Sequence, residues 1–76
     1  MRVTLEFLGI RLGGMKSGDD VEVGPDTTIA DLLRRHDAPE QDRALVIPLV
    51  NGELKPASYV LEQGDRLKLF LPVAGG

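Results

Sequence analysis

The sequence predicts a two-layer α+β domain in which one helix lies across one face of a four- or five-stranded mixed sheet. Residues 2–8 and 66–71 alternate apolar and polar side chains, as half-buried strands do. One segment between them, residues 28–37, has helical periodicity. Residues 57–63 are too few for the second helix that a ferredoxin-like fold requires. A length of 76 residues allows one such domain.

The first two strands are expected to form a hairpin. The apolar side chains of the first strand share one parity, and they are Val3, Leu5 and Phe7. The pattern breaks at the turn-forming residues 17–20 and resumes with Val21 and Val23. We therefore predict strands over residues 2–8 and 20–24, joined by a long, polar, glycine-rich loop.

The helix has a start signal, an apolar face and a stop signal. Thr28 can cap its N-terminus, and Asp31 completes a weak form of the capping box. The apolar face consists of Ile29, Leu32, Leu33 and His36. Pro39 ends the helix, because proline disfavours helical geometry in the residue before it. The helix is thus about ten residues long, which is enough to lie across a small sheet.

The second half of the chain predicts further strands. Residues 45–50 are apolar and largely β-branched. Pro48 cannot donate to a ladder, which places this strand at a sheet edge or in a bulge. The Asn-Gly pair at 51–52 is the strongest hairpin signal in the chain and leads to a short return strand at residues 53–55. The last strand follows over residues 66–71.

The composition excludes several kinds of chemistry. Without cysteine, the chain has no disulfide, thiolate metal ligand or thiol nucleophile. Its one histidine, His36, excludes a Cys/His zinc site, and we expect a half-buried ring at the C-terminal end of the helix. The net charge of −3 and a total of three aromatic residues argue against nucleic acid as a partner. We therefore expect neither a bound metal nor an enzyme acting by itself.

The expected location is the cytoplasm. No apolar run approaches the roughly 20 residues that a membrane span needs. Glu6 interrupts the stretch in which a signal peptide would be apolar. Both observations favour a soluble domain.

The last four residues, 73–76, are expected to project as a flexible arm from a domain of residues 1–72. Gly75 and Gly76 have no side chains, so they can thread a channel too narrow for other residues. The carboxylate of Gly76 is ionised and inert, so a partner would have to activate it, for example by adenylation. The alternative is an ordinary frayed terminus.

Apolar residues are also expected on the outer face of the sheet. If the apolar parity of the first and last strands faces inward, Leu8 and Phe70 face outward. Leu54, on the short return strand, is a third candidate. Three apolar side chains together near a reactive terminus would form a docking patch for the partner that handles the tail.

The C-terminal third of the chain resembles the MoaD/ThiS family of ubiquitin-like sulfur carriers. The residues that carry the resemblance are Val50-Asn51-Gly52-Glu53, Leu61, Gly64-Asp65 and Phe70-Leu71-Pro72-Val73-Ala74-Gly75-Gly76. The family includes the small subunit of molybdopterin synthase and the thiamine-pathway carrier. Its fold is the β-grasp, which has the order of strands and helix predicted above.

The resemblance implies a carrier protein that has no catalytic activity of its own. An ATP-dependent enzyme of the ubiquitin-activating type would adenylate the Gly76 carboxylate. A sulfur donor, such as a cysteine desulfurase or a rhodanese, would convert it to a thiocarboxylate, and a synthase subunit would accept the sulfur. The activating enzyme would use the ATP. We expect the carrier itself to bind no cofactor and, from its composition, no nucleic acid or membrane.

The resemblance also assigns roles to other residues. Gly75 is the residue without a side chain that precedes the reactive Gly76. Val73 and Ala74 form the rest of the arm that threads into the enzyme. The apolar positions at which molybdopterin-type members meet the activating enzyme correspond to Leu8, Leu54 and Phe70.

Two pathways and two other functions stay open. The long connection between the first strands, residues 8–19, favours a molybdopterin-type carrier over a thiamine-type carrier. The segment between the helix and Asn51 is, however, shorter than is usual in the molybdopterin type. A ubiquitin-like protein modifier would use the same activation but join Gly76 to a lysine. A β-grasp interaction module with an incidental tail is the remaining alternative.

Overall fold

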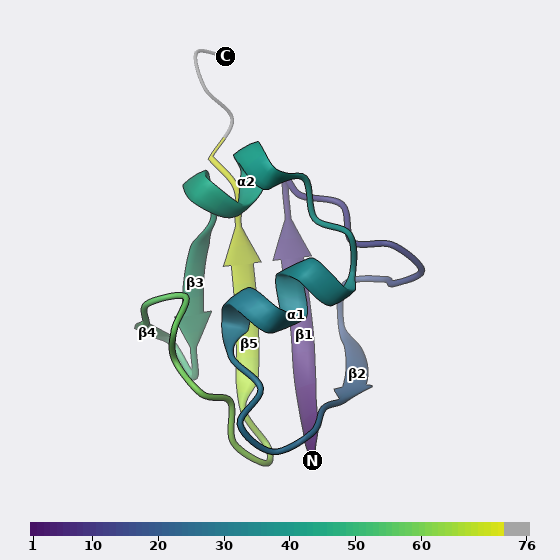
Figure 1. Cartoon of the computed structure of the whole chain (residues 1–76), viewed down its shortest axis with the longest axis vertical. Coiled ribbons are helices and arrows are strands. Elements are labelled where there is room, and N and C mark those ends of the chain that lie inside the picture. Colours follow the sequence, from purple (N-terminus) through teal and green to yellow (C-terminus); the bar gives the residue numbers. More distant parts are fainter. Residues whose placement is uncertain (73–76) are drawn as a thin grey trace.

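Residues 1–72 are described by a computed structural model, in which α1 lies across one face of a five-stranded sheet (Figure 1). The strands are β1 (Arg2–Leu8), β2 (Asp19–Glu22), β3 (Ile47–Val50), β4 (Glu53–Leu54) and β5 (Arg66–Phe70). The helices are α1 (Ile29–Arg35) and α2 (Glu40–Leu45). The strand order is β2-β1-β5-β3-β4, with β1 and β5 parallel and the other pairs antiparallel. This mixed sheet confirms the predicted fold class.

The core lies between α1 and the inner face of the sheet. Its buried apolar side chains come from both layers: Val3, Leu5, Val21, Val50, Leu67 and Leu69 from the strands, and Ile29, Leu32 and Leu33 from α1. Each fully buried side chain of this kind contributes about 1.5–3 kcal/mol. The alternation predicted for the first and last strands is confirmed, because the apolar parity is the buried one.

The connection between β1 and β2 is less polar than predicted. Ile10 and Leu12 are buried and belong to the core cluster. A domain of this size buries a smaller share of its unfolded surface than a larger domain does, so buried loop side chains help to complete its core. β2 ends at Glu22, before its predicted end at residue 24, although the Val23 amide still donates to the Met1 carbonyl at 2.7 Å.

The predicted capping box begins α1. The Asp31 amide donates to the Thr28 hydroxyl, and the Thr28 amide donates to the Asp31 carboxylate, both at 3.1 Å. The bond from the Thr28 backbone amide to the carboxylate is the main cause that holds the pKa of Asp31 below its ordinary value, and the Thr28 side chain and the Arg34 charge lower it further. The helix ends at Arg35, earlier than predicted, because Asp37 adopts a left-handed backbone with φ 58°.

A second helix, α2, was not predicted. Residues 45 and 46, expected in a strand, end and cap this helix, so β3 begins at Ile47. Glu40 and Asp42 in its first turn and Arg43 in its last turn favour a helix through its dipole. Within residues 1–72, neither helix is long and apolar enough to cross a membrane.

Pro48 does not mark a sheet edge. β3 lies between β5 and β4, and its register with β5 runs without a bulge through Pro48, so neither the predicted edge nor the predicted bulge is found. The Lys55 amide donates to the Pro48 carbonyl at 3.1 Å, on the β4 side of the strand. The nitrogen of Pro48 faces the same side, because N and C=O of one residue point the same way in a strand. The β3–β5 ladder therefore loses no hydrogen bond to the proline.

Candidate functional site

The apolar residues predicted on the outer face gather at the end of the sheet where β5 finishes. Leu8 on β1 and Phe70 on β5 are direct partners in the parallel ladder, so their side chains lie on the same face. Leu8 is 60% exposed and Phe70 is 37% exposed, whereas Leu69 beside them is fully buried. The structure thus brings together two of the three residues predicted for this face.

Leu54 lies on the same face, and two residues that were not predicted connect it to Leu8 and Phe70. Leu54 is exposed and opposes the half-buried Leu49 across the β3–β4 hairpin. Ile47 is exposed and opposes Phe70. These five side chains form what we call the outer apolar patch: Leu8, Ile47, Leu49, Leu54 and Phe70. The Asn-Gly turn could have revealed Leu49, because a two-residue loop fixes the register that places it opposite Leu54.

The chain leaves the sheet beside the outer apolar patch. The Leu71 amide donates to the Leu8 carbonyl at 2.9 Å, which extends the pairing of β1 with β5. Gly9 lies against this point with φ 82°, and a Cβ atom there would lie 2.5 Å from the Leu71 carbonyl oxygen. This close backbone contact fixes the position of Leu71. The predicted tail residues lie outside the described part of the chain: Val73, Ala74, Gly75 and Gly76.

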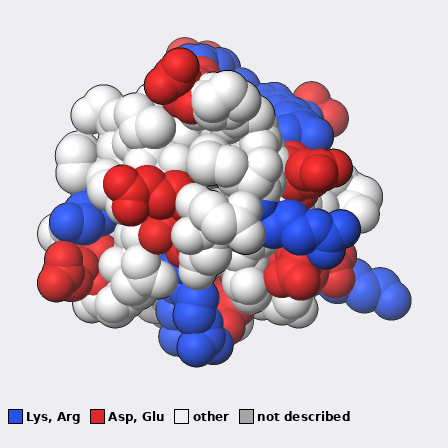
Figure 2. All heavy atoms as spheres, turned by 90° about the horizontal axis from the view of Figure 1, so that it is seen from below, with Lys and Arg blue, Asp and Glu red and all other residues white. Residues whose placement is uncertain are grey.

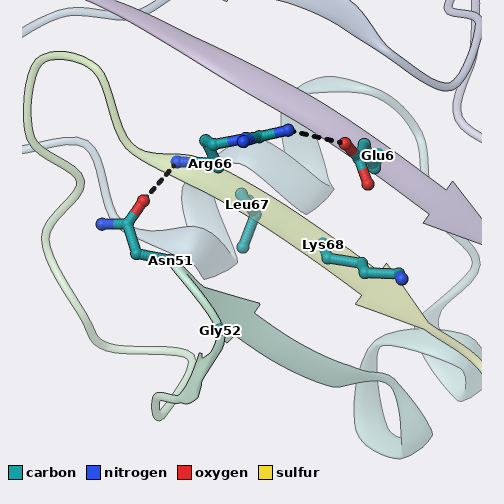
Figure 3. Close-up of a pocket in the computed structure, with 6 residues that line it drawn as sticks. All are labelled: Glu6, Asn51, Gly52, Arg66, Leu67 and Lys68. Carbon is teal, nitrogen blue, oxygen red and sulfur yellow. Dashed lines mark hydrogen bonds and ion pairs between the residues drawn. The ribbon is translucent and has the colours of Figure 1, made fainter.

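A hollow of about 340 Å³ lies on the outer face next to the patch (Figure 3). Its charged side chains are Glu6, Arg66 and Lys68. The Arg66 guanidinium is 3.7 Å from the Glu6 carboxylate, and the Arg66 amide donates to the Asn51 side chain at 3.0 Å. Because Arg66 and Glu6 are both solvated, their ion pair adds little to stability.

Asp65 is a buried carboxylate directly before β5, and it is 5% exposed. It accepts hydrogen bonds from the Asn51 side chain at 3.0 Å, the Tyr59 hydroxyl at 3.2 Å and the Glu62 amide at 2.8 Å. Desolvation, together with the neighbouring Asp65 carboxylate, raises the pKa of Tyr59. The bond from Asn51 ties the β3–β4 turn to the start of β5, and the other two tie the segment between β4 and β5 to the same point. Asp65 thus supports the strand that carries Phe70.

Replacing Asp65 by alanine is expected to lower the free energy of unfolding by about 3 kcal/mol, because three donors lose a charged acceptor. Urea unfolding followed by circular dichroism measures this loss. Glu62→Ala, which removes an exposed carboxylate nearby, is the control and should change stability by no more than about 0.5 kcal/mol. Equal losses in the two variants would contradict the role given to Asp65.

His36 occupies the C-terminal cap of α1 and is half-buried, as expected. Its carbonyl accepts a hydrogen bond from the Gly13 amide at 2.8 Å, which joins the helix to the β1–β2 connection. Within residues 1–72, the buried Nε2 atom of His36 has no hydrogen-bond partner. In the same part of the chain, no three His, Cys, Asp or Glu side chains gather as metal ligands.

The end of the molecule near the N-terminus carries charges of both signs. Figure 2 shows acidic and basic side chains spread around an uncharged centre on this face. Neither sign dominates it, so this end presents no strong field that would attract a polyanion.

Comparisons with known proteins agree on the fold. Residues 12–76 match the model of the ThiS family. SAMP1 from Haloferax volcanii has a similar structure, with 24% identity, 100% coverage of both chains and a TM-score of 0.68. A chain of the complex of subunits 1 and 2 of molybdopterin-converting factor from Helicobacter pylori 26695 is also similar, with 19% identity, 100% coverage of both chains and a TM-score of 0.64. No curated protein matches the sequence significantly.

Proposed function

The chain belongs to the ThiS family, and on that basis we propose that it is a sulfur carrier. In this proposal, an ATP-dependent enzyme of the ubiquitin-activating type adenylates the carboxylate of Gly76. A sulfur donor, such as a cysteine desulfurase or a rhodanese, then converts the adenylate to a thiocarboxylate. The carrier is a co-substrate of these enzymes, holds no cofactor of its own and works in the cytoplasm.

A carboxylate must be activated before it can accept sulfur, because its shared negative charge makes the carbon a poor electrophile. In the first step, a carboxylate oxygen attacks the α-phosphorus of ATP and displaces pyrophosphate. In the second step, a hydrosulfide ion, or a donor persulfide whose S–S bond a thiol then reduces, attacks the carbonyl carbon of the adenylate and AMP leaves. One C–O bond is thereby replaced by one C–S bond. Two easier steps replace one difficult step, as in other covalent mechanisms.

The observation that carries the proposal is the extent of the family match, because residues 12–76 include the pair Gly75 and Gly76. The chain has no cysteine, so the terminal carboxylate is the group on which it can hold sulfur. The outer apolar patch adds support, since Phe70 lies two residues before Pro72. An enzyme that acts on the tail can dock on the exposed apolar side chains at the end of β5, where the tail begins.

We propose that a synthase subunit accepts the sulfur, and we favour a molybdopterin-type pathway over a thiamine-type pathway. The long connection between β1 and β2, residues 9–18, supports the molybdopterin type. The similar chain from Helicobacter pylori belongs to a complex of two subunits, which makes a paired subunit a natural partner to test.

The proposal is tested by the intact mass of the protein. After incubation with the activating enzyme, ATP and sulfide, the activated carboxylate should exchange oxygen for sulfur and the chain should gain about 16 Da. The control omits ATP and should show no gain. If the chain instead forms lysine-linked conjugates and never gains this mass, it is a protein modifier.

A further inference from the structure

We propose that Lys68 forms an ion pair with a carboxylate of the activating enzyme, whose docking surface is therefore apolar with one acidic side chain facing β5. This inference rests on the proposed function, because it takes the outer apolar patch as the surface on which that enzyme docks. It adds the charge that the enzyme must present there.

Lys68 lies where the outer apolar patch meets the hollow. It precedes Phe70 by two residues on β5, so the two side chains leave the strand on the same face. Across the sheet it opposes Leu49 on β3 and Glu6 on β1. Any partner that covers Phe70 and Leu49 therefore also covers or borders Lys68.

The ammonium of Lys68 has no acidic partner within the described chain. Glu6, its direct neighbour across the ladder, pairs with Arg66 instead. Figure 3 shows the side chain of Lys68 extending along β5, away from Glu6. Among residues 1–72, none of the ion pairs involves Lys68. Its charge is thus available to a partner.

The charge of the hollow is opposite to that of the whole chain. Arg66 and Lys68 contribute two positive charges and Glu6 one negative charge, so the hollow carries +1, whereas the chain carries −3. Docking on the patch removes water from Lys68, and a cation that loses water without gaining an anion opposes binding. A carboxylate on the enzyme restores the balance and selects the orientation of docking.

The inference is tested by the kinetics of adenylation, measured as ATP–pyrophosphate exchange with the full-length chain and the purified activating enzyme of the same organism. Lys68→Glu should raise the KM for the carrier about tenfold or more and leave kcat within about twofold, because charge repulsion acts on binding. Lys68→Met keeps an apolar stem but no charge. It should raise KM about threefold and flatten the dependence of KM on KCl between about 0.05 M and about 0.5 M.

Lys16→Glu is the matched control, because it makes the same change in net charge at an exposed residue of the β1–β2 connection. Its KM should stay within about twofold of the wild-type value. If Lys68→Glu behaves like Lys16→Glu, or if it lowers KM, the enzyme presents no carboxylate there and the inference is wrong. A wild-type chain that is never adenylated would overturn the proposed function, and this inference with it.

Discussion

Changing Phe70 to aspartate is expected to lower kcat/KM for adenylation by about 100-fold or more while the domain stays folded. Phe70 is central in the outer apolar patch, since Leu8 opposes it on one side and Ile47 on the other. Aromatic side chains at the centre of an interface commonly dominate binding, and about 3 kcal/mol corresponds to about 100-fold. Phe70→Ser, which removes the ring without placing a negative charge next to Lys68, should lose most of the same activity.

The fold should survive this substitution because the side chain of Phe70 points away from the core. Leu67 and Leu69, which are fully buried, supply the packing of β5 on α1. Aspartate is unfavourable in a strand by about 1 kcal/mol. For a domain of this size, we therefore expect the midpoint of thermal unfolding to fall by about 4–8 °C. Circular dichroism during a thermal scan measures both the retained fold and this shift.

Val60→Asp is the matched control for Phe70→Asp. Val60 is 44% exposed and pairs with Thr28, the residue that caps the start of α1, so it lies away from the outer apolar patch. This variant should keep kcat/KM within about twofold, as expected for a residue outside the interface. A Phe70→Asp chain that unfolds would refute its outward orientation. A folded chain that is adenylated normally would refute the patch as the docking surface.

The elements that could be predicted are those whose burial leaves a periodic trace in the sequence. β1 and β5 have one buried face and one exposed face, so their side chains alternate. α1 has both an apolar face and a capping box. α2 has no buried residue, so no apolar periodicity marks it. The parallel pairing of β1 with β5 joins the two ends of the chain, and no local pattern specifies such a pairing.

The same reasoning separates the predicted from the missed residues of the candidate site. Leu8 and Phe70 could be assigned to the outer face because their strands alternate. Ile47 and Leu49 lie in a continuous apolar run, whose pattern does not tell one face from the other. The availability of Lys68 could not be predicted either. It follows from the pairing of Glu6 with Arg66, which depends on the three-dimensional register.

Removing Gly75 and Gly76 is expected to abolish adenylation and the gain of mass without weakening the fold. The shortened chain would end at Ala74, and two extended residues span about 7 Å. Reacting atoms must approach to about 3–3.5 Å, so the new carboxylate stops short of the nucleotide while the patch is docked. The core and the caps described above lie within residues 1–72, so the free energy of unfolding should change by no more than about 0.5 kcal/mol.

A variant of full length distinguishes the effect of tail length from the effect of a side chain at position 75. Gly75→Val keeps the position of the carboxylate along the chain but adds a side chain where a narrow channel would exclude one. It should lower kcat for adenylation by about 100-fold or more and leave KM within about threefold, because docking on the patch is unchanged. A Gly75→Val chain with normal kcat would show that the length of the tail matters and that the absence of a side chain at position 75 does not.

The shortened chain also tests whether the patch supplies the binding energy. It keeps Leu8, Phe70 and Lys68, so it should compete with the wild-type chain for the activating enzyme, with an inhibition constant within about threefold of the wild-type KM. Adding Phe70→Asp to the shortened chain should remove the inhibition. If the shortened chain does not inhibit, the tail supplies the binding and the patch serves another partner. If instead it replaces the wild-type chain fully in cells, the tail is incidental and the protein is an interaction module.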